Sequence, residues 1–92
     1  MDEPEKMAQM NAWLDEVCEA LGVHRADLAA VTPAVLGLVS QVAHGPSRPA
    51  GPLTAMAVGI AASRADGDFV PAVEDAIGKL QPLLAPYRDN AK

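Results

Sequence analysis

Apolar residues in this chain recur at intervals of three and four positions, and this spacing constrains the fold more than any other feature. Such intervals place apolar side chains on one face of an α-helix. Four segments show the pattern, through Met7, Met10, Leu14, Val17 and Leu21; Val35, Leu38, Val39 and Val42; Leu53, Met56, Ala57, Ile60 and Ala61; and Val70, Val73, Ile77, Leu80 and Leu84. No segment alternates with a period of two, the pattern of a half-buried strand. We therefore predict an all-α protein with four main helices and no strands.

The first helical segment has a signal at each end. Asp2 and Glu5 have the spacing of a capping box, which begins a helix. Gly22 follows the last residue of the apolar stripe, where a glycine in the left-handed conformation commonly ends a helix. Beyond it, residues 24–30 predict a short extra helical turn.

The second and third segments are separated by a connector rich in proline and glycine. Thr32 followed by Pro33 predicts the start of the second main helix, because a capping hydroxyl precedes a proline suited to the first helical position. Gly45 is expected to end that helix. Residues 45–52 hold three prolines and two glycines, so we expect a fixed, non-helical connector. Pro52 then predicts the start of the third helix, which we expect to be central.

The fourth segment is bounded by different residues. Asp68 is the predicted cap at its start. Pro82 lies inside the apolar pattern, and since an internal proline removes a backbone donor, we expect a kink or a break near Gln81. Pro86 and the polar tail that follows it are expected to end the helical structure.

Together these elements predict a compact bundle of four main helices in a single domain, residues 1–92, with frayed ends at about 1–4 and 88–92. Hydrophobic residues make up 50% of the chain, but only Trp13, Phe69 and Tyr87 are aromatic. The core is therefore expected to be aliphatic.

The net charge of −5 lies in the first helical segment. Residues 1–21 carry six acidic side chains against Lys6 alone, and the rest of the chain is balanced. Nucleic-acid binding needs a basic face, so this charge argues against it. The acidic helix is either a solvated surface or a docking surface for a basic partner.

The chain shows no sign of export or membrane insertion. Its acidic N-terminus lacks the basic and apolar regions of a signal peptide, and no predicted apolar segment approaches the ~20 residues of a membrane helix. Cys18 is the only cysteine and forms no internal disulfide. We expect a cytoplasmic protein without a membrane partner.

The connector also carries the strongest candidate binding site. Arg48 offers a fork of donors suited to phosphate or carboxylate, and His44 a switchable charge. The backbone amides of Leu53 and Thr54, with the Thr54 hydroxyl, are expected at the start of the third helix, where anions bind. In the alternative interpretation, His44 stabilises its own helix end and Arg48 bonds terminal carbonyls or a carboxylate of the first helix. Both interpretations stay open, with Gly45, Pro49 and Pro52 as the structural residues of the connector.

Other chemistry is not favoured by the sequence. Ser47 and His44 have no nucleophile-elbow pattern, and Cys18, His24 and His44 do not have zinc-site spacing. We expect no catalytic residue, no metal site and no cofactor. A protein partner or a homodimer is expected instead, with a candidate interface on the first helix at Trp13, Met10 and Glu16.

The connector and its flanks resemble a known family. The residues that carry the likeness are Val42-Ala43-His44-Gly45, Arg48-Pro49 and Pro52-Leu53-Thr54-Ala55, followed by Gly59 and Ala61, with Trp13-Leu14 and Leu21-Gly22 upstream. This pattern resembles a small actinobacterial family of uncharacterised domains, found with or fused to molybdopterin-guanine dinucleotide biosynthesis protein A. The likeness covers residues of about 10 to 85.

The resemblance implies a role near molybdenum-cofactor maturation. It does not imply guanylyl transfer, because that enzyme class uses an α/β nucleotide-binding domain with a glycine-rich loop, and neither is present. We therefore expect a non-catalytic accessory or interaction domain. The alternatives are a self-associating structural domain, and a small phosphate- or nucleotide-binding module that uses His44 and Arg48.

Overall fold

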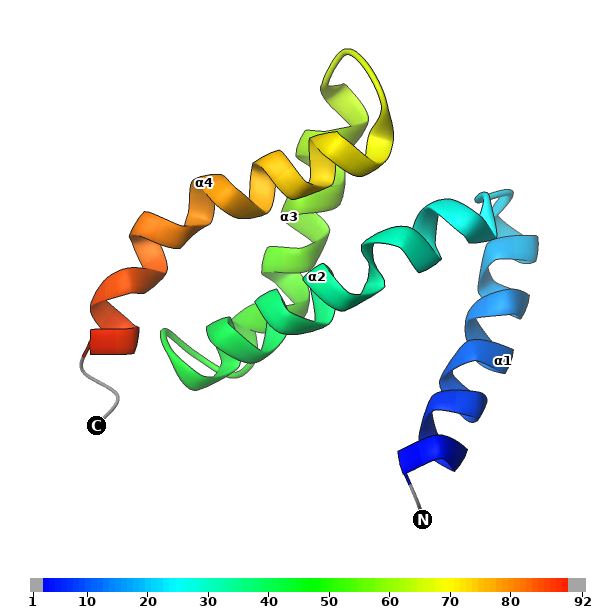
Figure 1. Ribbon diagram of the computed structural model, residues 1–92, viewed down its shortest axis with the longest axis horizontal. Helices are drawn as coiled ribbons and strands as arrows, with labels where there is room; N and C mark the ends of the chain where they lie inside the picture. Colours follow the sequence, from blue (N-terminus) through cyan, green and yellow to red (C-terminus); the bar gives the residue numbers. More distant parts are fainter. Residues whose placement is uncertain (1–2, 90–92) are drawn as a thin grey trace. The chain divides into compact units, whose positions relative to one another are not determined.

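The structure, a computed structural model, describes residues 3–89, and all the regular secondary structure among them is helical. Its four α-helices are α1 (Glu3–Leu21), α2 (Arg25–His44), α3 (Ala50–Arg64) and α4 (Phe69–Asp89) (Figure 1). No strand occurs among these residues, which confirms the predicted all-α class with four main helices. The chain divides into two compact units, Met1–Ala30 and Val31–Lys92, which we call the N-terminal and C-terminal units.

The N-terminal unit contains α1, the turn after it and the first residues of α2. Gly22 has a φ of 68° and ends α1 as predicted. The Val23 amide donates to the Cys18 carbonyl at 2.9 Å, and the Gly22 amide donates to the Glu19 carbonyl at 3.4 Å, the bonding of a glycine-capped helix end. The predicted cap at Asp2 lies outside the described residues.

An arginine ties α1 to the start of α2 within this unit. The Arg25 Nε donates to an Asp15 carboxylate oxygen at 2.8 Å, and its Nη2 donates to the Asn11 side chain at 3.2 Å. The Arg25 side chain is 28% exposed, so this ion pair is partly shielded from solvent.

α2 begins earlier than predicted. It runs without interruption through Thr32 and Pro33, so the expected short extra turn and the expected second helix are one element. The missing amide of Pro33 removes one helical hydrogen bond. Val31 and Leu38, which flank the proline, are 3% and 1% exposed, and their burial holds the helix together across it.

The joined helix also corrects an expectation about membranes. α2 has 20 residues and a mean hydropathy of 1.5, which make it long and apolar enough to cross a membrane by length and composition alone. The sequence predicted a short helical turn before Thr32 and a separate helix after it, and neither of these is that long. In this structure, 17% of the most apolar 18-residue stretch of α2 is buried.

The other two helices extend beyond their predicted ends. α3 begins at Ala50, two residues before Pro52. α4 continues through Pro82 and Pro86, so the predicted break near Gln81 and the predicted end at Pro86 are wrong. The Gln81 Nε2 lies 3.4 Å from the Ile77 carbonyl, which gives that turn of α4 a side-chain donor beside the proline.

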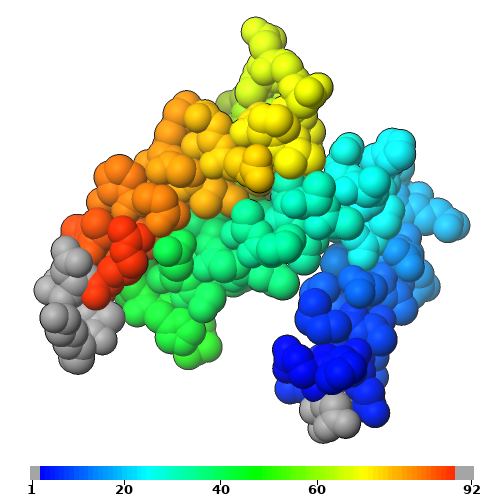
Figure 2. Space-filling view, in the orientation of Figure 1, coloured from blue at the N-terminus to red at the C-terminus, as the bar shows by residue number. Residues whose placement is uncertain are grey.

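The core of the C-terminal unit is aliphatic, as predicted, and lies among α2, α3 and α4. Figure 2 shows side chains of α4 lying against those of α2. The buried apolar residues of this unit are Val31, Leu38, Val42, Val58, Ala62, Val73 and Leu84.

α3 buries a different face from the predicted one. Its buried residues are Gly51, Val58 and Ala62. Leu53 and Met56, which belong to the predicted apolar face, are 71% and 64% exposed. Small side chains let α3 approach its neighbours closely, and the larger ones are left on the surface.

Candidate functional site

His44 is the last residue of α2 and is exposed. Its Nδ1 lies 2.8 Å from the Ser40 carbonyl oxygen. A carbonyl oxygen only accepts, so Nδ1 carries the hydrogen and donates it. This bond joins the His44 ring to the last turn of α2, in line with the interpretation in which His44 stabilises its own helix end.

Arg48 lies in the connector with its side chain exposed. Its guanidinium makes no hydrogen bond or ion pair with residues 3–88, while its carbonyl accepts the Gly51 amide at 3.2 Å. The described contacts therefore do not include the expected bonds from Arg48 to terminal carbonyls or to a carboxylate of α1.

The start of α3 differs from the predicted anion-binding arrangement. The amides of Ala50 and Gly51 donate to the carbonyls of Ser47 and Arg48, both at 3.2 Å, and Pro52 has no amide hydrogen.

The two residues expected to bind an anion lie one turn further on. Leu53 and Thr54 follow the first three residues of α3, and the Thr54 hydroxyl donates to the Ala50 carbonyl at 2.7 Å. Pro49 precedes the helix in the right-handed conformation without a side-chain cap. Among the candidate residues, His44 and Arg48 retain exposed side chains suited to an anion.

The connector glycines allow close helix contacts. A Cβ on Gly45 would lie 3.0 Å from the Gln41 carbonyl oxygen and 3.1 Å from the Tyr87 Cβ. A Cβ on Gly51 would lie 3.1 Å from the Val39 Cγ1. These two positions bring α4 and α3 against α2, so the connector is a structural joint.

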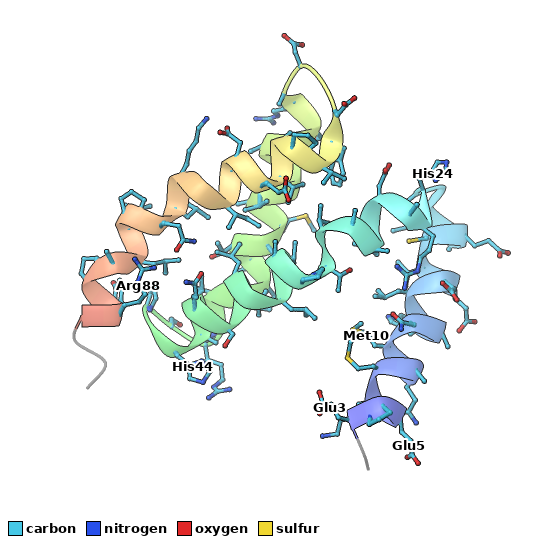
Figure 3. The ribbon with its side chains drawn as sticks, viewed as in Figure 1. Glu3, Glu5, Met10, His24, His44 and Arg88 are labelled. Atoms are coloured by element: carbon cyan, nitrogen blue, oxygen red, sulfur yellow. The ribbon has the colours of Figure 1, made fainter. Side chains whose placement is uncertain are left out.

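A small hollow lies beside this joint, and the sequence did not predict it. It has a volume of about 110 Å³ and is lined by Gln41, His44, Gly45, Leu84, Tyr87 and Arg88. Figure 3 shows His44 and Arg88 at the same end of the unit, where α2 and α4 finish.

Gln81 joins two of the residues that line this hollow, Gln41 and Arg88, by side-chain hydrogen bonds. The Arg88 Nη1 donates to the Gln81 side-chain oxygen at 2.9 Å, and the Gln41 and Gln81 amides lie 3.4 Å apart. Arg88 was assigned to a frayed tail, so no sequence signal linked it to His44.

A larger apolar depression, the α3–α4 groove, lies between those two helices. Its volume is about 620 Å³. The residues that line it are Ala50, Leu53, Thr54, Ala57, Val58, Ala61 and Ala65 on the α3 side, and Ala72, Asp75, Ala76, Lys79 and Leu80 on the α4 side. Lys79 and Asp75 pair at 3.3 Å at its edge. Ala57 and Ala61 were predicted to lie on the core-facing side of the third helix, and they line this open groove instead.

The candidate interface on α1 is largely exposed. Trp13 is 63% exposed, Glu16 is exposed and Met10 is half-buried. Asn11 and Asp15, which Arg25 binds, each lie two positions from Trp13. Residues two apart on a helix point about 200° apart. Trp13 therefore projects from the side of α1 opposite the Arg25 contacts.

Among the side chains of residues 3–88, no three His, Cys, Asp or Glu residues gather as metal ligands.

A family model for a domain of unknown function, DUF6457, matches residues 5–92. The chain belongs to this family. No curated protein and no solved structure matches the chain. The family match covers nearly the whole chain, but the family has no assigned function.

Proposed function

We propose that this domain is a non-catalytic interaction module that binds an amphipathic helix in the α3–α4 groove. The observation that carries the proposal is the groove itself, an apolar depression of about 620 Å³ on a small domain. Contiguous exposed apolar surface on a soluble domain commonly marks a site of protein interaction.

The shape of the groove favours a helix as its occupant. Its α3 side runs from Ala50 to Ala65, a length of about 22 Å at 1.5 Å per residue. Alanines on both walls leave room for the larger side chains of a partner helix. Helices with apolar residues three and four apart bind grooves of this kind.

Selection from a displayed library of amphipathic helical peptides tests this proposal. Peptides enriched on the wild-type chain should carry apolar residues at helical spacing and should lose binding to Ala61→Glu, which places a charge in the groove. Ser63→Glu is the matched control, because Ser63 is exposed on α3 and does not line the groove. Peptides that bind wild type and Ala61→Glu equally, or no enrichment at all, would refute the proposal.

A second candidate function is the binding of a phosphate-bearing ligand at the connector. The exposed guanidinium of Arg48, without a partner among the described residues, supports it. Titration with inorganic phosphate, followed by amide chemical shifts, should perturb residues near His44 and Arg48. Arg48→Ala should abolish these shifts and Arg64→Ala should keep them. Equal responses of the two variants would refute this function.

We propose further that the partner belongs to molybdenum-cofactor maturation. The support is the resemblance of the connector, from His44-Gly45 to Pro52-Leu53, to the family found with molybdopterin-guanine dinucleotide biosynthesis protein A. Disruption of the gene should lower the activity of enzymes that need this cofactor. The wild-type chain should restore that activity and the Ala61→Glu chain should not. Normal activity after disruption would contradict the link.

A further inference from the structure

Two apolar surfaces in this chain are at least partly open to solvent. One is the α3–α4 groove, whose residues Ala57 and Ala61 are exposed. The other is the side of α1 that carries Trp13, which is 63% exposed, and Met10 and Val17, which are half-buried. These three residues are three and four positions apart, so they share one face of the helix.

The dimensions of the two surfaces agree. α1 has 19 residues and is about 28 Å long, so it spans the groove, which is about 22 Å long on its α3 side. The groove has mainly small side chains, whereas the α1 face has large ones. Tryptophan is the residue most often found at the centre of an interface, where it fills a desolvated pocket.

The charge of α1 suits a basic side chain at the end of the groove. α1 carries five acidic residues against Lys6. Lys79 lies at the edge of the groove but pairs with Asp75 at 3.3 Å, so this pair adds no net charge. Arg64 lies seven residues after Ala57, so it continues the groove face of α3 by helical periodicity. Glu16, three residues after Trp13, is placed to approach such a basic side chain.

We infer that the α3–α4 groove of one copy binds the Met10–Trp13–Val17 face of α1 from a second copy. This inference rests on the proposed function and names the helix that the groove takes. Each chain holds both surfaces, so a pair of copies makes the contact twice. Trp13 on α1 and Ala57 and Ala61 in the groove are exposed, so each surface has apolar area that a second copy can cover.

Trp13 is the only tryptophan, and its fluorescence reports the contact directly. In a dilution series of the full chain, sedimentation should show the mass rising from monomer to dimer with concentration. The Trp13 emission should move to shorter wavelength over the same concentration range, because the indole leaves water. The dissociation constant should rise about 30-fold or more in Ala61→Glu and in Trp13→Ala, the loss typical of an interface hot spot. Ser63→Glu should dimerise as wild type does.

Mixing the two weakened variants provides a sharper test. The Ala61→Glu chain keeps an intact α1 face, and the Trp13→Ala chain keeps an intact groove. Their mixture should form a heterodimer with one good contact, and the Trp13 emission of the Ala61→Glu chain should shift on mixing. No shift on mixing would overturn the inference.

Two further results would also overturn it. A monomer at every concentration with solvent-exposed Trp13 emission would show that the α1 face binds no groove. A short-wavelength emission at monomer mass would show that α1 binds the groove of its own chain. The helix selection, repeated on the Trp13→Ala chain, separates the two proposals. After either of these results, binding of displayed helices by the Trp13→Ala chain would leave the proposed function standing, so that only the inference fails. If this chain binds no displayed helix, the proposed function fails as well.

Discussion

Gly45 offers the sharpest test of the packing at the connector. In Gly45→Ala, the new Cβ would lie 3.0 Å from the Gln41 carbonyl oxygen and 3.1 Å from the Tyr87 Cβ. Carbon atoms in favourable contact are about 3.5–4.0 Å apart, so these distances are too short by roughly half an ångström. Neither neighbour is the free end of a flexible side chain, so the backbone of α2 or α4 must move.

The cost follows from overpacking. Extra methyl groups in well-packed sites cost about 1–3 kcal/mol. The lower backbone entropy of alanine in the unfolded chain offsets about 0.4–1 kcal/mol of this cost. We expect Gly45→Ala to lower the free energy of unfolding by about 1–2 kcal/mol. For a domain of this size, the melting temperature should fall by about 4–8 °C for each kcal/mol.

Gly78→Ala is the matched control. Gly78 lies inside α4, and a Cβ there meets nothing within 4 Å. Alanine at this position should stabilise the helix by about 0.5–1 kcal/mol. Thermal unfolding monitored by circular dichroism should therefore shift in opposite directions for the two variants. A Gly45→Ala chain as stable as Gly78→Ala would refute the close contact between α2 and α4.

Three further predictions concern stability. Leu38→Ala removes a side chain that is 1% exposed, and it should lower the free energy of unfolding in urea by about 2–5 kcal/mol. The control is Leu36→Ala on the same helix. The Leu36 side chain is 47% exposed, so its loss should change the free energy of unfolding by about 0.5 kcal/mol or less. Equal losses would contradict the assigned faces of α2. Arg25→Ala breaks the 2.8 Å ion pair with Asp15. It should lower the free energy of unfolding by about 0.5–1 kcal/mol at low salt and speed amide exchange in α1. A loss of stability that does not depend on salt would count against the ion pair. Gly22→Ala forces a side chain into a φ of 68° and should cost about 1 kcal/mol in thermal unfolding, and no loss would contradict the left-handed cap.

The candidate site was predicted only in part. His44 and Arg48 were named from the sequence, and both have exposed side chains at the connector. Tyr87 and Arg88 were missed, because their approach to α2 depends on α4 continuing past two prolines. The α3–α4 groove was missed for a related reason: its alanines were assigned to the core by their spacing, and spacing alone does not show which face a neighbouring helix covers.

Local rules in the sequence determined the class and several boundaries of this protein. The three- and four-residue spacing required helices, Gly22 ended α1, and Gly45 followed the last residue of α2. These features depend on backbone conformation within a few residues, so no distant contact was needed to predict them.

Only the tertiary structure decided how far the helices run and which faces they bury. Pro33 and Pro82 each remove one hydrogen bond, and packing on both sides of each proline outweighs that local cost. α3 buries the face of Gly51, Val58 and Ala62 because small side chains permit the closest approach to neighbouring helices. Leu53, Met56 and Ile60 then remain at the surface, and Leu53 lines part of the groove that we assign to binding.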